Sequence, residues 1–316
     1  MKIALVGCGA MGSLIGGKLA AAGQKMFFVD PWKEHVDAIN KNGLLMVESA
    51  TGAEEIVRVT ATTNPDDVGV VDVIIFLVKG TKSRETIQRV KGMIDEDTIV
   101  VTFQNGLGNT DLLAEYVNPE NVAFGVIDSS AGIDGPGKIH YQLADGKIAC
   151  DTHTGNKNEK FEKLLEVLNK AGFDAYLSDD ATYRIWNKLV VNANYNVLCG
   201  IIGVRLGELI SVDEGRKLIE GITRELIDVA NAKGIMLDYN ESMEHMKDFG
   251  LKISLHYPSL AQDVARKVPT EIDFLNGAIV REGKKVGIPT PINETVYNIL
   301  KVIEANYDVG KEFSTK

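Results

Sequence analysis

The chain has 316 residues, of which 45% are hydrophobic and 25% are charged, and its formal net charge is −10. This length exceeds what one hydrophobic core organises well, so we expect two domains. The negative charge, with no basic block along the sequence, argues against a nucleic-acid partner or an anionic membrane surface. Three widely spaced cysteines, Cys8, Cys150 and Cys199, favour a reduced cytoplasmic protein over a disulfide scaffold.

The first part of the chain alternates short apolar runs with helical segments. Its first run, KIALVG, ends in glycines and is too short for a signal peptide or a membrane span, which supports a cytoplasmic location. We expect strands at 2–7, 25–30, 71–79, 98–106 and 121–126, helices at 8–23 and 31–43, and a strand pair at 43–49 and 54–62. This alternation favours a parallel sheet covered on both faces by helices.

The character of the sequence changes near residue 180. GKIHYQLADGKIACD (137–151) carries Asp-Gly between two alternating runs, which predicts a β-hairpin. After FDAYLSDD (173–180) the strand signals stop, and we expect helices at 181–199, 213–233, 241–249 and 270–304, the last with breaks at Gly287 and Pro289. The sequence therefore predicts an α/β domain over residues 1–179 and an all-α domain over residues 180–316. Ligand clefts tend to form at such a junction.

The segment GCGAMG places Gly7, Gly9 and Gly12 in a GxGxxG pattern. The pattern follows the first strand and opens a helix, which is the context of a dinucleotide-binding Rossmann domain. There the first glycine permits a tight turn, the second lets a pyrophosphate approach, and the third allows close helix–strand packing. The same glycines also suit a plain strand–helix turn. In the nucleotide-binding interpretation the whole loop contacts the cofactor, including Cys8, Ala10 and Met11.

Asp30 stands at the end of the second strand, about 20 residues after the glycine pattern, as expected for a carboxylate that accepts hydrogen bonds from the adenosine ribose. A carboxylate there repels a 2′-phosphate, so the sequence favours NAD(H) over NADP(H). Lys33 and Lys79 are candidates for a phosphate contact, which leaves NADP(H) open. A role for Asp30 as a helix N-cap is compatible with cofactor binding.

Three more polar residues suit a functional site. Asn105 follows a strand at the edge where open α/β sheets bind ligands, although an Asn-Gly turn also explains it. Glu271 lies in the first turn of an expected helix, where the macrodipole favours glutamate. Ser259 either caps a helix or faces a ligand. A lone histidine such as His256 is more often structural than catalytic.

The segment RIWNKLVVNANYN (184–196) predicts a helix that is apolar almost all round and therefore buried. Within it, Lys188, Asn192 and Asn196 follow one another at i, i+4 and i+8, which places them on one face. A buried ammonium group and buried amides cost free energy unless something satisfies them. This polar stripe is therefore either a cross-helix hydrogen-bond network or part of a ligand site.

In this order, the blocks GCGAMG, LVKG, QNGLG, IWNKLVVNANYN, PSLAQD and TEIDFLNG resemble the ketopantoate reductase (2-dehydropantoate 2-reductase) family over essentially the whole chain. The last three blocks are quite specific, whereas the glycine pattern indicates only the cofactor class. The resemblance implies a Rossmann domain followed by a helical domain, and reduction of a small 2-keto acid to a D-2-hydroxy acid at the cleft between them. It also implies a homodimer, and we expect no metal.

The resemblance assigns roles to the matching residues. Lys188 matches the catalytic lysine, which protonates the forming hydroxyl, and Glu271 matches a glutamate needed in the same pocket. Asn192 and Asn196 match asparagines that hold the substrate, and Ser259 matches a serine on the substrate carboxylate. Asn105 matches an asparagine beside substrate and cofactor, and Lys79 matches a lysine near the cofactor. Physically, a positioned ammonium stabilises the charge that builds on a ketone oxygen as hydride arrives.

Leu206 and His256 depart from the family pattern, which often has amides at both positions beside the substrate. Leu206 weakens the case for ketopantoate and favours the NAD-dependent D-2-hydroxyacid dehydrogenases of this family, which act on bulky 2-keto acids such as benzoylformate. Two further alternatives are a β-hydroxyacid dehydrogenase, which shares the Lys-x-x-x-Asn spacing, and a non-catalytic nicotinamide-dependent sensor. The PSLAQD and TEIDFLNG blocks argue against a β-hydroxyacid dehydrogenase. The presence of Lys188 together with Glu271 argues against a non-catalytic sensor.

Overall fold

The computed structural model describes residues 1–143, 145–157, 159–255 and 257–308. The chain divides into two compact units, each described here by itself. The first, which we call the sheet unit, comprises Met1–Gln104 and Asn109–Ala181. The second, the helical unit, comprises Asn105–Gly108 and the chain from Thr182 onward. Nothing in the sequence indicated that the short segment Asn105–Gly108 would group with the helices.

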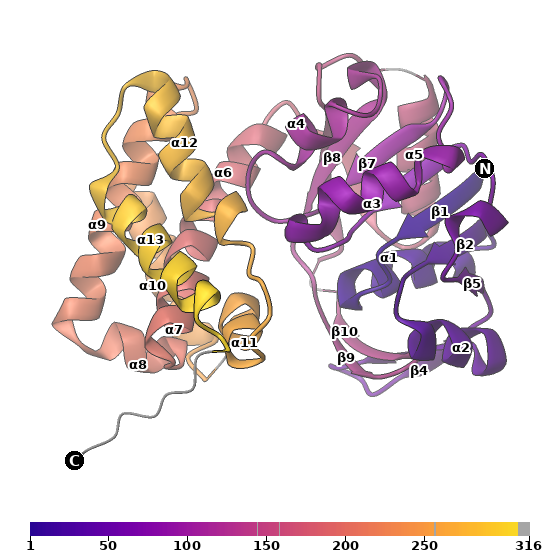
Figure 1. Cartoon of the computed structure of the whole chain (residues 1–316), viewed down its shortest axis with the longest axis horizontal. Coiled ribbons are helices and arrows are strands. Elements are labelled where there is room, and N and C mark those ends of the chain that lie inside the picture. The colour runs from indigo at the N-terminus through magenta and orange to yellow at the C-terminus, as the bar shows by residue number, and fades with distance from the viewer. Residues whose placement is uncertain (144, 158, 256, 309–316) are drawn as a thin grey trace. The chain divides into compact units, whose positions relative to one another are not determined.

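The sheet unit alternates strands and helices along most of its length (Figure 1). Its elements are β1 (Lys2–Val6), α1 (Ala10–Ala21), β2 (Lys25–Val29), α2 (Lys33–Asn42), β3 (Leu44–Glu48), β4 (Glu54–Val57), β5 (Thr60–Thr62), β6 (Val73–Phe76), α3 (Ser83–Arg89), β7 (Ile99–Thr102), α4 (Asn109–Ala114), β8 (Val122–Ile127), β9 (Ser130–Gly135), β10 (Lys138–Gln142), β11 (Lys147–Thr152), α5 (Glu159–Lys170) and β12 (Asp174–Leu177).

Within the described residues, the main sheet has eight strands in the order β12-β11-β8-β7-β6-β1-β2-β5. The adjacent strands β5, β2, β1, β6, β7 and β8 pair in parallel, and this is the strand order of a doubly wound nucleotide-binding sheet. The inner strands β6 and β7 are buried on both faces, as their continuous apolar runs require. β11 runs antiparallel to β8, so the sheet is mixed and the expectation of a purely parallel sheet was too simple. The predicted α/β fold is confirmed.

A second sheet, in the order β4-β3-β10-β9, corrects two predictions. The predicted hairpin over 137–151 is wrong, because β10 pairs with β3 and β9 whereas β11 enters the main sheet. The burial patterns give the reason: β10 alternates buried and exposed residues, whereas β11 has three consecutive buried residues and is therefore buried on both faces. The predicted strand over 54–62 is two strands, since β4 pairs with β3 and β5 pairs with β2 of the main sheet.

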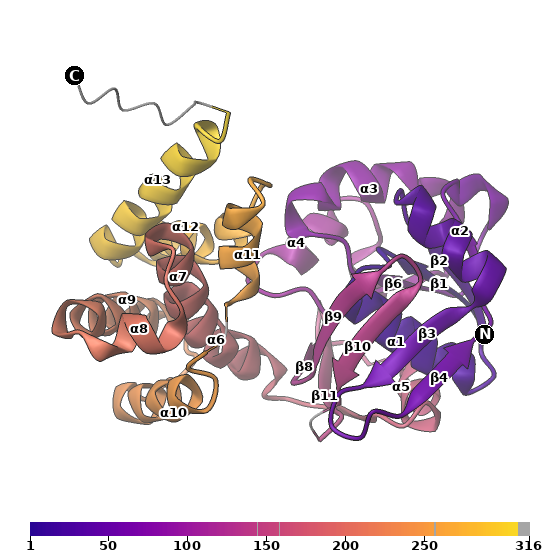
Figure 2. The same ribbon diagram turned by 90° about the horizontal axis from the view of Figure 1, so that it is seen from below.

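Helix α1 lies between the two sheets (Figure 2), since it contacts β1 and β2 on one side and β3, β9 and β10 on the other. Its buried Leu14, Ile15 and Leu19 share one core with Phe28 of β2 and Met46 of β3. A separate core lies under α3 and α4, on the opposite face of the main sheet. The sheet is therefore covered on both sides, and α1 is fixed at the start of the first strand–helix crossover.

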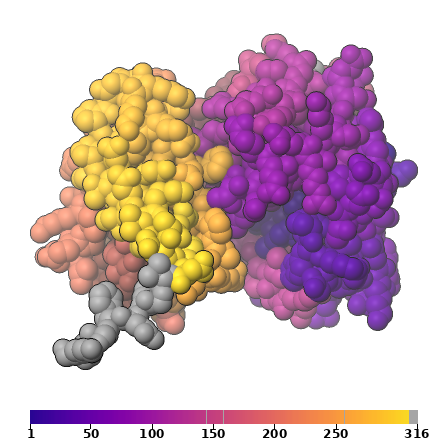
Figure 3. Space-filling model, viewed as in Figure 1, coloured from indigo at the N-terminus to yellow at the C-terminus, as the bar shows by residue number. Residues whose placement is uncertain are grey.

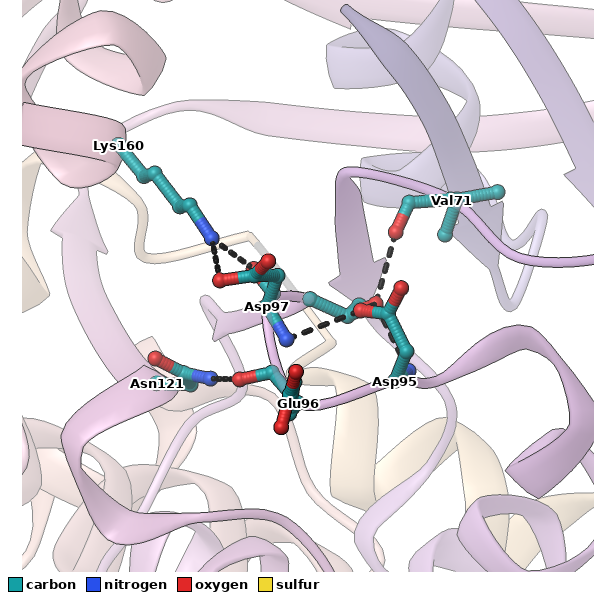
Figure 4. A network of polar contacts seen from close by, with 7 residues as sticks. Val71, Asp95, Glu96, Asp97, Asn121 and Lys160 are labelled. Atoms are coloured by element: carbon teal, nitrogen blue, oxygen red, sulfur yellow. Dashed lines mark hydrogen bonds and ion pairs between the residues drawn. The ribbon is translucent and has the colours of Figure 1, made fainter.

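A polar network closes the edge of the main sheet where the parallel strands begin (Figure 4). Lys160 of α5 binds the side chain of Asp97, and the Asp97 amide donates to Asp95 at 2.9 Å. Hydrogen bonds from the Asp97 amide and from the hydroxyl of Thr98 lower the pKa of Asp95. Asn121 donates to the Glu96 carbonyl at 2.7 Å. The acidic side chains of this network are exposed, and the network ties loops together at the amino ends of the strands, opposite to the edge that carries the glycine loop.

The helical unit contains, in chain order, α6 (Ala181–Val191), a π-helical turn (Asn192–Asn196), α7 (Val197–Ile202), α8 (Leu206–Ser211), α9 (Asp213–Ala232), α10 (Tyr239–Lys252), α11 (Ser259–Ala265), α12 (Asn276–Val286) and α13 (Pro291–Ala305). Its described part is all-α, as predicted. Helix α12 ends at Gly287, which adopts φ 75°, and α13 restarts at a proline, so the expected break is confirmed. The sequence did not predict α8.

The core of the helical unit forms where α7, α9, α12 and α13 meet. Helix α13, drawn in yellow, forms a large part of this unit's visible surface (Figure 3). Its inner face buries Val296 and Leu300, while Ile299 and Val302 are exposed. Among the described residues, no helix combines the length and the apolar character needed to cross a bilayer. All three cysteines lie in the described part of the chain, where they are buried and form no disulfide.

Candidate active site

The glycine loop after β1 packs tightly against neighbouring backbone atoms. Gly7 adopts φ 95°, and a Cβ at this position would stand 2.6 Å from the Val78 nitrogen. A Cβ at Gly12 would stand 2.1 Å from the Gly7 carbonyl oxygen, so helix α1 approaches the turn as closely as glycine permits. At Gly9 no described atom lies within 4 Å of the corresponding point. The loop is therefore tight where it packs and open at Gly9, which fits the approach of a pyrophosphate to the start of α1.

Asp30 joins the end of β2 to the glycine loop. Its carboxylate accepts hydrogen bonds from the Cys8 nitrogen at 2.6 Å and from the Trp32 nitrogen at 2.9 Å. It is not the N-cap of α2, because that position belongs to Trp32. A carboxylate offers about four acceptor sites, so capacity for ribose hydroxyls is left. Lys33, a candidate for a phosphate contact, lies on α2 and pairs with Asp37 at 2.7 Å.

A buried hydrogen-bond chain supports the loop from below. The Gly137 nitrogen donates to Nδ1 of His35 at 3.0 Å, so Nδ1 is an acceptor and the proton of the neutral ring is on Nε2. Nε2 lies 3.4 Å from the Ser13 hydroxyl, which donates to the Cys8 carbonyl at 2.9 Å. Burial lowers the pKa of His35. Asp30 and Ser13 therefore hold both sides of the Cys8 residue, and burial together with Asp30 raises the pKa of the Cys8 thiol.

Lys79 follows β6, at the same edge of the sheet as the glycine loop, and is exposed. The loop that carries it is held by Gln104, which donates to the Val78 carbonyl at 2.6 Å and to the Ser83 hydroxyl at 2.9 Å. Gln104 in turn accepts a hydrogen bond from Thr102 at 2.8 Å. The glutamine of the QNGLG block thus fixes the ends of two neighbouring strands.

The polar stripe of the helical unit lies at the end of α6 and in the π-helical turn that follows. Lys188, Asn192 and Asn196 are half-buried, while the neighbouring Val190 and Val197 are buried in the core. The Asn196 amide donates to the Asn192 amide oxygen at 3.3 Å, which confirms that these two side chains share a face. The predicted helix over 181–199 is thus helical throughout but is not one α-helix.

The structure brings the QNGLG and TEIDFLNG blocks together. The Leu107 nitrogen donates to the Phe274 carbonyl at 2.9 Å. Gly106 adopts φ 86°, and a Cβ there would stand 2.2 Å from the Phe274 oxygen. Asn105 therefore begins a segment that packs directly beside the short 3₁₀ turn Ile272–Phe274. Glu271 is half-buried and immediately precedes this turn, rather than lying in the first turn of an α-helix as predicted.

Ser259 is the exposed first residue of α11, whose N-cap is Pro258, so it does not cap the helix. Helix α11 packs against α7 and the π-helical turn, which places the PSLAQD block beside the asparagine pair. Leu206, expected to border a pocket, is fully buried in the core of the helical unit. His256 lies outside the described residues. Within the described ranges, no group of three or more His, Cys, Asp or Glu residues is arranged so that it could hold a metal ion.

The fold and the glycine loop define the class of the protein as a dinucleotide-binding protein, with a Rossmann-type unit and an all-α unit. Two family models, "Ketopantoate reductase PanE/ApbA" and "Ketopantoate reductase PanE/ApbA C terminal", match residues 3–154 and 180–304. The chain belongs to the ketopantoate reductase family, and it is an NAD(P)-dependent oxidoreductase.

The similarity to other enzymes extends over almost the whole chain. The chain is 31% identical to the 2-dehydropantoate 2-reductase of Streptococcus pyogenes serotype M18 over 306 residues, which cover 96% of this chain and 98% of that one. The enzyme of the same name from Lactococcus lactis is 32% identical over 92% of this chain and 94% of its own. Among solved structures, D-mandelate dehydrogenase with NADH and anilino(oxo)acetate has a TM-score of 0.88 at 32% identity, covering 98% of this chain and 100% of that one.

Four residues that support the site were not singled out from the sequence: Ser13, His35, Gln104 and Asn276, the last of which binds the π-helical turn. For two of them a signal existed. His35 lies next to Val36 and one turn before Ile39 on the buried face of α2, where a polar residue needs a partner. Gln104 directly follows a buried strand in a block already quoted. The other two are recognisable only from their contacts.

Proposed function

We propose that this protein transfers hydride from NADH to the carbonyl carbon of a 2-keto acid and gives a D-2-hydroxy acid. The observation that carries the proposal is the stripe of Lys188, Asn192 and Asn196, which is half-buried on an otherwise apolar helix. An ammonium group beside two amides suits a keto acid, because the ammonium stabilises a developing oxyanion and the amides both donate to and accept from polar groups of a substrate.

The cofactor supplies the hydride when it is bound, and the loop Gly7–Gly12 with Asp30 would hold it in the sheet unit. The helical unit then has to stabilise the negative charge that develops on the substrate and to supply one proton. As the carbonyl carbon accepts hydride, its oxygen becomes negative, and the Lys188 ammonium stabilises that charge and donates a proton from Nζ. The products are the hydroxy acid, the oxidised cofactor NAD⁺ and a neutral lysine, which regains its proton from solvent.

The other matched residues orient the substrate. The Asn192 and Asn196 amides bind its polar groups, and Ser259 at the start of α11 donates to its carboxylate. Glu271 acts in the same pocket as Lys188, and Asn105 lies in the segment that packs beside the Glu271 turn. Lys79, exposed at the edge of the glycine loop, contacts the cofactor.

NADH is the proposed cofactor because Asp30 faces the glycine loop. Its carboxylate already binds the Cys8 and Trp32 nitrogens, so it is fixed where a 2′-phosphate would be repelled. Two solved relatives at 32% identity are NADH complexes of D-mandelate dehydrogenase.

The first candidate substrate is ketopantoate (2-dehydropantoate), because relatives named 2-dehydropantoate 2-reductase match nearly the full chain. The second is a bulkier 2-keto acid such as benzoylformate. It is favoured by the D-mandelate dehydrogenase structure, which matches with a TM-score of 0.88, and by the preference for NADH that Asp30 implies. We also propose a cytoplasmic location, on the grounds of the three widely spaced cysteines, and a homodimer, on the grounds of the family alone.

The decisive experiment measures oxidation of NADH and of NADPH with ketopantoate, benzoylformate and branched aliphatic 2-keto acids. Lys188→Ala should lower kcat by about 10²–10⁴-fold, the usual contribution of a positioned general acid, with little change in the Kd for NADH. Lys217→Ala, on the exposed face of α9, is the matched control and should leave kcat unchanged. Near-normal turnover of Lys188→Ala would remove the lysine from the mechanism.

Glu271→Gln should raise KM for the keto acid and lower kcat while circular dichroism shows an intact fold. Unfolding of this variant would instead make Glu271 a structural residue. The alternatives are separated in the same assays. A sensor binds NADH without turning over any keto acid, and a β-hydroxyacid dehydrogenase oxidises 3-hydroxy acids with NAD while leaving 2-keto acids untouched.

A further inference from the structure

The helix that carries the polar stripe changes its winding at the asparagine pair. Residues Asn192–Asn196 form a π-helical turn between α6 and α7. In an uninterrupted α-helix, Asn196 would lie about 80° around the axis from Lys188, because each residue turns the helix by about 100°. A π-turn closes over one more residue, which reduces this drift and brings Asn196 back toward the side of Lys188. The 3.3 Å hydrogen bond between Asn196 and Asn192 agrees with this alignment.

Such turns are rare and need stabilisation from outside the helix, because they disturb the regular backbone hydrogen bonds. Two fully buried asparagines provide it. The Asn194 amide donates to the Val190 carbonyl at 2.8 Å and to the Thr223 hydroxyl at 3.0 Å. The Asn276 amide donates to the Ala193 carbonyl at 3.1 Å. Carbonyl groups at the start of the turn thus bind side-chain donors in a core without access to water.

The Asn276 amide is oriented by a second asparagine and a carboxylate. Glu225 of α9 accepts the side-chain amide of Asn293 at 2.7 Å and its backbone nitrogen at 2.9 Å. Because a carboxylate only accepts, Asn293 must turn its nitrogen toward Glu225 and its oxygen toward Asn276. That oxygen accepts from the Asn276 nitrogen at 2.9 Å. The same nitrogen is thereby aimed at the Ala193 carbonyl.

We propose that Asn276 and Asn293 are positioning residues for the reaction. Through the directed chain Glu225–Asn293–Asn276–Ala193 they hold the π-helical turn, and the turn points Asn192 and Asn196 to the side of Lys188. Neither positioning residue touches the substrate. The catalytic consequence rests on the proposed function of the stripe, whereas the structural part, support of the turn, does not depend on any substrate.

The test is Asn276→Asp, which keeps the size of the side chain but presents an acceptor where the Ala193 carbonyl needs a donor. The matched control is Asn231→Asp at the end of α9, because Asn231 also binds backbone, with its amide on the Leu237 carbonyl and its oxygen on the Leu237 nitrogen. We measure amide hydrogen exchange across residues 186–202, the Kd for NADH, and kcat and KM for ketopantoate and benzoylformate.

Asn276→Asp should speed exchange in residues 186–202 by about tenfold or more, because local opening becomes easier. It should lower kcat/KM for the keto acid about 10–100-fold and change the Kd for NADH less than twofold. Asn231→Asp should lower the melting temperature without either effect. The proposal would be overturned if Asn276→Asp had amide exchange rates and a kcat/KM within twofold of the wild type. It would also be overturned if Asn276→Asp and Asn231→Asp changed these two quantities equally.

If Asn276→Asp does not fold, Asn276→Ser replaces it, since a hydroxyl still donates to one of the two acceptors. The expected changes are then smaller, about three- to tenfold in both readouts, and their absence counts against the proposal. If the wild type reduces neither keto acid, the proposed function fails, and the exchange result alone decides whether the chain of side chains supports the turn.

Discussion

Replacing Glu225 by glutamine should strongly destabilise the helical unit, although it hardly changes the shape of the side chain. Its carboxylate accepts from the Ile292 nitrogen at 2.8 Å, and from the backbone nitrogen and side-chain amide of Asn293 at 2.9 and 2.7 Å. These backbone groups begin α13, where N–H groups have no partner within the helix. Glutamine has a single oxygen, so at least one buried N–H loses its acceptor.

The cost follows from two contributions. A buried donor left without a partner costs about 1–3 kcal/mol. The lost negative charge at the N-terminus of α13 adds about 0.3–1 kcal/mol, and more when the site is partly buried. We therefore expect Glu225→Gln to lower the free energy of unfolding by about 2–4 kcal/mol, which corresponds to a decrease in Tm of about 5–15 °C for a unit of this size.

The assay uses a tryptophan that lies in the affected unit. Trp186 is buried in the helical core, and the second tryptophan, Trp32, belongs to the sheet unit, so a Trp32→Phe background makes fluorescence specific for the helical unit. Urea unfolding in that background gives the free energy and the slope m. Glu220→Gln, exposed on the same helix, should change the stability by less than about 0.5 kcal/mol. A Glu225→Gln variant as stable as this control would refute the reasoning.

Three other outcomes are expected. Asp30→Ser should shift the ratio of kcat/KM for NADH and NADPH about tenfold or more toward NADPH, and a wild type that prefers NADPH would contradict the role of the carboxylate. Because burial lowers the pKa of His35, the unfolded chain takes up the proton at a higher pH than the folded chain, so the urea midpoint should fall as the pH drops below about 6.5. His35→Phe should make the urea midpoint depend less on pH in this range, and an equal pH dependence in both proteins would count against the role of His35. Leu206→Asn should lower the free energy of unfolding by about 3–5 kcal/mol, because a fully buried leucine is replaced by an unpartnered amide. A Leu206→Asn variant with the wild-type Tm and a changed preference among 2-keto acids would show instead that this position contacts the substrate.

Local patterns in the sequence were sufficient for the parts of the structure that depend on neighbours along the chain. The glycine loop and Asp30 could be predicted because a strand, a tight turn and a helix follow one another within about 30 residues. The all-α character of the second part followed from helical periodicity. The stripe from Lys188 to Asn196 could be predicted as roughly one face because residues at i, i+4 and i+8 stay within about 80° of one another even in a regular α-helix. The closer alignment that the π-turn gives could not.

The missed features depend on contacts between distant residues. Whether β11 pairs with β10 or with β8 is decided by which face of each strand is buried, and both alternatives contain the same turn residues. The π-helical turn depends on a hydrogen bond from Asn276 to Ala193, 83 residues earlier in the chain. The support of the glycine loop by His35 requires Gly137, 102 residues away. No periodicity within a short window contains this information.

The segment Asn105–Gly108 limits how the protein can be divided. It is bounded on both sides by the sheet unit, yet Leu107 donates to the Phe274 carbonyl and Gly106 packs against the same group. A fragment that begins after Ala181 would contain the helices of the helical unit but would leave this carbonyl without its donor. The two units are therefore not independent modules that gene fusion could exchange at one junction. Any transplant of the helical part into another scaffold must also bring these four residues from the middle of the Rossmann-type part.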